Sequence, residues 1–213
     1  PYSRIALAIE ALDGASDAFA TIAIAGHSEH EHYIYREGID LTTIPAGLQR
    51  LTLVGGLCPD AQWQVDPSAC RSIVEPRFLR DLSAGNYAAF NVGAAHAQQE
   101  IVLNGLTLRC QRAALESVPA GIRLFAVLAL QGHQVLEQID VQVLGFENDD
   151  FQNATAVGLD CRDAFTDGQV TMETANALQF GVMHLAPRQG GGIAGVNVSM
   201  DHGTQYLHVL LGW

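Results

Sequence analysis

The chain has 213 residues, of which 48% are hydrophobic and 16% charged, and its formal net charge is −12. This length and composition fit one domain with a large apolar core and exclude a disordered chain. The negative charge excludes nucleic acid and anionic membranes as favourable partners, because both require clustered positive charge. No apolar run approaches the roughly 20 residues of a transmembrane helix, so we expect no membrane insertion of this segment.

The N-terminal residues predict a short helix followed by a strand. Within residues 4–12, Ile5, Ala8, Ile9 and Leu12 have the spacing of one face of an amphipathic helix. Gly14 follows at a position where helices commonly end. We expect residues 1–14 to cap a longer β structure, because a helix there would cover its unpaired edge.

The segment "HSEHEH" at residues 27–32 is a candidate metal site. His30 and His32 would lie on one face of a strand, because side chains two positions apart share a face. Imidazoles and carboxylates at this density can bind zinc, nickel or copper, which makes His27, His30 and His32 candidate ligands. The alternative is a solvated loop, since a closed site needs three or four converging ligands.

Cys58 and Cys70 flank a loop that is rich in Pro, Asp and Gln. We predict that they form a disulfide, which would contribute roughly 3 kcal/mol in the chain-entropy model. Such a bond would place the protein outside the cytosol. The alternative is two free thiols that pack as small hydrophobic groups. For Cys110 and Cys161, pairing and separate burial both remain open.

Short β runs recur along the whole chain and predict a solenoid. The units "GLTLR", "DVQVLG", "QVTMET" and "GVNVSMD" align with Thr107, Val141, Thr171 and Val198 in one register. This pattern predicts an all-β, right-handed parallel β-helix over residues 1–213 as a single domain. An antiparallel sandwich or jelly roll is the alternative, although the chain offers few Asn-Gly or Asp-Gly hairpins. Strands are expected at Ala20–Gly26, Ile39–Thr43, Leu51–Val54, Ser72–Val74, Ala88–Val92, Ile101–Arg109, Ile122–Leu130, Ile139–Phe146, Val157–Cys161, Val170–Glu173, Leu178–Leu185, Ile193–Met200 and Tyr206–Leu211.

Acidic residues gather between positions 147 and 167. Asp149, Asp150, Asp160 and Asp163 are candidate catalytic groups, because polysaccharide hydrolysis uses two carboxylates about 5–10 Å apart. The same oxygens could bind calcium. The simpler interpretation is a set of solvated loop residues without a cofactor, because carboxylates mostly lie exposed.

Three sequence stretches resemble the opening coils of one protein family. These are "ALDGASDAFATIAIAGHSEHEHYIYREGIDL", "GLQRLTLVGG" and "SIVEPR". They are similar to right-handed parallel β-helix proteins of the pectin-lyase-like superfamily, over about the first 110 residues. The resemblance implies the fold and an extracytoplasmic setting. The superfamily includes polysaccharide lyases and hydrolases, phage tailspikes, and passengers or adhesins on the surface of Gram-negative bacteria.

The resemblance also suggests an arginine base, as in calcium-dependent pectate lyases, and Arg109, Arg112 and Arg162 are the candidates. An arginine usually stays charged and serves as an ion-pair partner. Compared with the hydrolases of the superfamily, "NDD" at residues 148–150 lacks the accompanying "GHG" and "RIK" motifs.

We therefore expect a secreted or outer-surface binding or structural module, similar to an adhesin or an autotransporter passenger. It would contact a glycan or a host or cell-surface protein through the loops at residues 57–71 and 148–168, because loops on a rigid scaffold commonly carry contacts. The alternative is a polysaccharide lyase or glycoside hydrolase on the same fold, with or without calcium. The β run that leads directly to Trp213 suggests a fragment of a longer protein with further domains.

Overall fold

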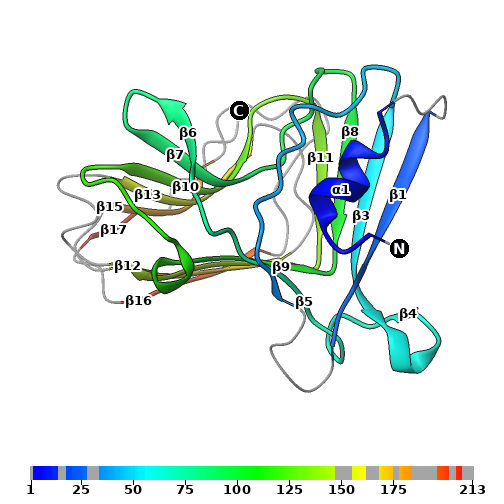
Figure 1. The fold of residues 1–213 in the computed structure, drawn as a ribbon. Coiled ribbons are helices and arrows are strands. Elements are labelled where there is room, and N and C mark those ends of the chain that lie inside the picture. Colours follow the sequence, from blue (N-terminus) through cyan, green and yellow to red (C-terminus); the bar gives the residue numbers. More distant parts are fainter. Residues whose placement is uncertain are drawn as a thin grey trace.

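The chain winds through three sheets of parallel strands that surround one apolar core (Figure 1). This computed structural model describes residues 2–13, 18–27 and 34–146 in full, together with the backbone of five later strands. Successive passes of the chain add strands to the same sheets, so that strands distant in sequence become neighbours. This arrangement is the predicted β-solenoid, and the antiparallel sandwich is excluded because the neighbours along each sheet run parallel, apart from two short strands.

The first sheet contains, in spatial order, β1 (Phe19–Ala25), β3 (Arg50–Cys58), β8 (Glu100–Asn104) and β11 (His133–Glu137). The second contains β2 (Ile34–Tyr35), β5 (Ser72–Val74), β9 (Leu106–Gln111), β12 (Ile139–Phe146), β14 (Gly168–Thr174) and β16 (Val196–Asp201). The third contains β7 (Asn86–Asn91), β10 (Arg123–Ala129), β13 (Thr155–Cys161), β15 (Leu178–Met183) and β17 (Gln205–Leu207). Two short strands, β4 (Gln64–Val65) and β6 (Arg80–Ser83), pair antiparallel with β3 and β7. Single 3-10 turns lie at η2 (Pro59–Ala61) and η3 (Arg112–Ala114).

Aliphatic side chains form rows that run from one coil to the next. In the first sheet, Ile22, Leu53, Leu103 and Leu136 pair in register, and all four are buried. Each such side chain contributes roughly 1.5–3 kcal/mol through its removal from water. The stacked rows are therefore the main stabilising element of the solenoid.

The register of the second sheet differs from the predicted one by one residue. Strands β9, β12, β14 and β16 are successive neighbours, as expected, but Val141 pairs with Leu108 and Val170 instead of Thr107 and Thr171. Val170 in turn pairs with Val198. The alignment of sequence motifs compared residue types but not the face of the sheet on which each side chain lies. A shift of one residue exchanges the buried and the solvent-facing sides, so the alignment gave the wrong register.

The corner between the first and second sheets requires left-handed backbone. It is formed by Gly105 (φ 66°) and Gln138 (φ 52°) on successive coils, and Gly56 (φ 71°) lies at a register shift within β3. A Cβ atom on Gly105 would lie 2.7 Å from Pro67 Cγ and 3.1 Å from the Gly55 carbonyl oxygen. Glycine is needed at position 105 for both reasons. The prediction of one strand over residues 101–109 was wrong, because this corner divides it into β8 and β9.

The N-terminal helix caps the first coil, as predicted, and spans Ile5–Glu10 (α1). Six residues are too few for a helix to be stable alone. The Glu37 carboxylate accepts hydrogen bonds from the Ile5 N–H at 2.7 Å and the Ala6 N–H at 3.0 Å, and Ile5 and Ile9 are buried in the core. The helix is therefore held by the coil that it covers. The strand expected at residues 39–43 is only an isolated bridge between Asp40 and Asn91.

Candidate functional site

The predicted disulfide closes a loop at the first-to-second sheet corner. Cys58 and Cys70 are bonded, with their Cα atoms 5.4 Å apart. Inside the loop, Asp66 Oδ1 accepts hydrogen bonds from the Ser68 hydroxyl at 2.6 Å, the Ser68 N–H at 3.1 Å and the Ala69 N–H at 3.0 Å. These bonds, the Ser68 hydroxyl first, lower the pKa of Asp66 below 3.8. The loop therefore presents a fixed, ionised carboxylate.

A hollow of about 600 Å³ with both polar and apolar walls lies beside this loop, and we call it the loop hollow. Its other wall comes from the corners of the next two coils, where Asn104 and Gln138 stand. The Asn104 amide donates a hydrogen bond to the Glu137 carboxylate at 3.0 Å. One carboxylate, one hydroxyl and two amides thus supply both donors and acceptors. The full lining is Val65, Asp66, Pro67, Ser68, Asn104 and Gln138.

Sequence reasoning identified the disulfide loop but missed Asn104 and Gln138. These two residues lie far from the loop in sequence and reach it only because consecutive coils stack. The Asn-Gly pair at residues 104–105 could have indicated a corner. Nothing comparable marks Gln138.

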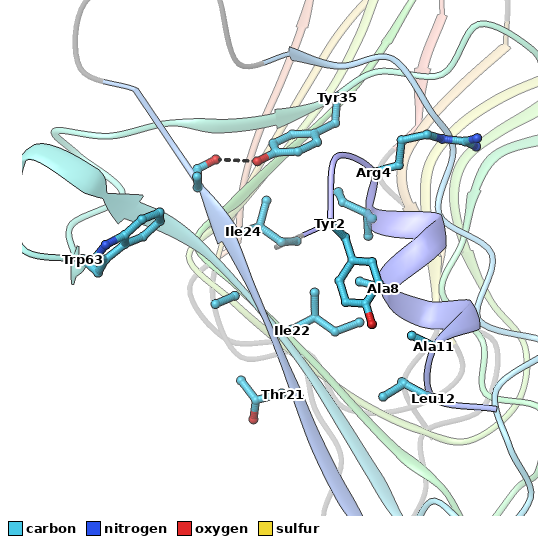
Figure 2. A pocket seen from close by; sticks show the side chains of 13 residues that line it. Tyr2, Arg4, Ala8, Ala11, Leu12, Thr21, Ile22, Ile24, Tyr35 and Trp63 are labelled. Atoms are coloured by element: carbon cyan, nitrogen blue, oxygen red, sulfur yellow. Dashed lines mark hydrogen bonds between the residues drawn. The ribbon is translucent and has the colours of Figure 1, made fainter. Parts of the chain in front are cut away.

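A second, apolar cleft of about 390 Å³ separates α1 from β1 (Figure 2). In the figure, Ile22 and Ile24 project from the strand and Ala8 from the helix, while Trp63 stands on the far side of β1. The Tyr35 hydroxyl donates to the Ala25 carbonyl at 3.1 Å and closes one end. We call this feature the α1–β1 cleft.

A charged cluster lies on the second sheet. Glu75 is fully buried and forms ion pairs with Arg36 and with Arg109, whose Nε lies 2.6 Å from Glu75 Oε1. This ion pair favours a structural role for Arg109 over that of a catalytic base. Beyond it, Asp140 accepts a hydrogen bond from the Gln142 amide at 2.6 Å. Burial is the main influence on Asp140 and raises its pKa above 3.8.

The candidate metal ligands are only partly described. His27 exchanges backbone hydrogen bonds with Arg71, at 3.2 and 3.3 Å, at the same corner as the disulfide loop. His30 and His32 lie outside the described residues. Within the part that the structure describes, no three His, Cys, Asp or Glu side chains are grouped to hold a metal ion. The histidine site stays a prediction.

The candidate catalytic carboxylates also remain predictions. Asp160 belongs to β13 and pairs in register with Leu128 and Met183, whereas Asp149, Asp150 and Asp163 lie outside the described residues.

Cys110 is a free thiol, so it does not pair with Cys161, and its complete burial raises its pKa to about 12.

Among the described residues, no helix has the length and apolar character needed to cross a membrane. No protein-family model, no curated protein and no solved structure matches the chain.

Proposed function

We propose that this chain is an extracytoplasmic binding module of the pectin-lyase-like β-helix type, and that it recognises an uncharged glycan. The loop hollow is the observation that carries the proposal. The Cys58–Cys70 disulfide supports a compartment outside the cytosol, because such bonds persist mainly in oxidising environments. An adhesin-like or passenger-like role on a cell surface agrees with a rigid solenoid that displays loops.

The chemistry of the loop hollow favours sugar hydroxyls. Each hydroxyl group can donate one hydrogen bond and accept others, which suits a site that mixes a carboxylate, a hydroxyl and amides. Asp66 is already held by three hydrogen bonds, so little ordering is required on binding. Val65, which is 52% exposed, adds an apolar contact for the C–H face of a sugar ring. The net charge of −12 disfavours polyanionic glycans.

An array of neutral and acidic oligosaccharides tests the proposal, followed by calorimetry on the best neutral ligand. Gln138→Ala should weaken binding about two- to tenfold, the effect of one lost hydrogen bond. Gln131→Ala is the matched control, because Gln131 is also exposed but does not line the hollow. Absence of any neutral ligand, or equal affinities for both variants, would overturn the proposal.

The same ligands distinguish the runner-up function, a polysaccharide lyase or glycoside hydrolase. The bound oligosaccharide is incubated with the protein, with and without calcium, and the products are separated by chromatography. Intact oligosaccharide supports the binding module. Cleavage that is lost in Asp149, Asp150, Asp160 or Asp163 variants would instead establish the enzyme.

A further inference from the structure

The strand β1 has one open edge. In the described part of the chain it pairs only with β3. The Arg50 N–H donates to Ala18 O at one end of the pair, and the Gly26 N–H donates to Leu57 O at the other. In a parallel sheet, every second residue of a strand directs its N–H and C=O groups toward the same neighbour. Ala18 and Gly26 bond to β3, so the N–H and C=O groups of Thr21 and Ala23, at odd-numbered positions between them, point away from β3.

The β1 strand itself, with the sequence "FATIAIA", carries neither the charges nor the proline that often prevent another strand from pairing, while α1 lies beside it across the α1–β1 cleft. Seven large apolar side chains are exposed in the described part of the chain. Four of them belong to α1, to β1, to the residues before α1 or to the wall of the α1–β1 cleft, namely Tyr2 (61% exposed), Leu7 (38%), Phe19 (66%) and Trp63 (59%).

The α1–β1 cleft runs along this open edge and has room for side chains. Residues from both faces of β1 line it, including Ile22 and Ala23, so the cleft reaches around the edge of the strand. Ala8 and Ala11 on the α1 side leave the space unfilled (Figure 2). Because a cavity of about 150 Å³ holds a benzene molecule, 390 Å³ accommodates roughly two or three aliphatic side chains.

We propose that β1 and the α1–β1 cleft bind an extended segment of another protein as an added β-strand. Backbone groups of the segment pair with Thr21 and Ala23, and every second side chain enters the cleft. The segment carries aliphatic residues at those alternate positions. Basic residues flank it, because Glu10 and Asp13 are exposed at the end of α1, while Arg4, the one charged residue of the cleft lining, is already paired with Glu37. This surface is separate from the loop hollow and goes beyond the glycan function.

A fluorescent synthetic peptide of seven alternating threonines and valines, flanked by paired arginines, probes the site by anisotropy. The control peptide has the same flanks and a central proline pair, which prevents strand pairing. We expect the first peptide to bind the full chain and the control peptide to bind at least tenfold more weakly. Equal binding of the two peptides would mean attraction by charge alone and would overturn the proposal, as would no binding.

Two substitutions locate the binding site. Ala23→Pro removes an outward N–H without removing a bond to β3, and Ala11→Trp fills the cleft from an exposed position. Each should weaken peptide binding at least tenfold, whereas Ala120→Trp, at an exposed position outside the cleft, should leave it within twofold. Unchanged binding in Ala11→Trp would refute the site even if Ala23→Pro did not fold. Binding of the neutral glycan should be unaffected, so the two proposals fail separately.

Discussion

Gly105→Ala tests the corner geometry of the solenoid. Gly105 has φ 66°, where an L-residue with a Cβ costs roughly 1–2 kcal/mol. The added Cβ would lie 2.7 Å from Pro67 Cγ, and overpacking of this kind costs about 1–3 kcal/mol. Part of the contact relaxes by movement of the Pro67 ring. We therefore expect a loss of about 2–4 kcal/mol in the free energy of unfolding.

The assay is urea unfolding followed by far-UV circular dichroism, without reducing agent. Ala84→Gly is the reverse substitution at another left-handed position, since Ala84 has φ 50° in the β6–β7 turn. It relieves strain but gives the unfolded chain more freedom, so its net effect should lie between zero and about 1 kcal/mol of stabilisation. A cost below about 0.5 kcal/mol for Gly105→Ala would refute the strained corner, as would a destabilisation by Ala84→Gly similar to that caused by Gly105→Ala.

Three further predictions concern the disulfide and the charged cluster. Glu75→Ala should cost about 3–5 kcal/mol in urea unfolding, because it leaves the Arg109 guanidinium without its buried partner; a loss below about 1 kcal/mol would contradict this. Replacing both Cys58 and Cys70 by serine should lower the free energy of unfolding by roughly 3 kcal/mol. Thermal unfolding of the variant is compared with that of the wild type in reducing agent, which should be destabilised similarly. Unchanged stability of the variant would show that the disulfide does not stabilise the fold. The raised pKa of Asp140 means that the folded state binds its proton more tightly, so Asp140 lowers stability as the pH rises from about 3.8 through the raised value. Asp140→Asn should therefore raise the urea midpoint at pH 7 and lose that advantage below pH 3.8, whereas a lower midpoint at pH 7 would refute the assignment.

The general fold could be predicted because local patterns report it directly. Alternating aliphatic residues identified Ser72–Val74 and Ile139–Phe146 with the bounds that the structure has. Apolar spacing of three and four located the capping helix. The disulfide between Cys58 and Cys70 could be predicted because the two residues flank a single loop.

Strand β11 was missed because its pattern is weak. It spans His133–Glu137, and its inward Gln134 is fully buried although glutamine normally marks a solvent position. The Gln134 amide is satisfied by a hydrogen bond to the Gln131 carbonyl. Such a local bond cannot be recognised from the order of residues alone.

The loop hollow could be predicted only in part. The loop between the two cysteines was expected to carry contacts, but its facing residues depend on which corners stack upon it. That stacking follows from the length of each coil, and loops of unequal length conceal the register. The same uncertainty produced the one-residue error at Thr107 and Thr171.

Interstrand nuclear Overhauser effects test the stack of parallel coils most directly. Parallel neighbours should give Hα-to-amide contacts that link Leu53 to the neighbourhood of Leu103, and Leu103 to that of Leu136. Strong Hα-to-Hα contacts between these strands would indicate antiparallel pairing. That result would contradict the solenoid, and with it both proposed binding surfaces.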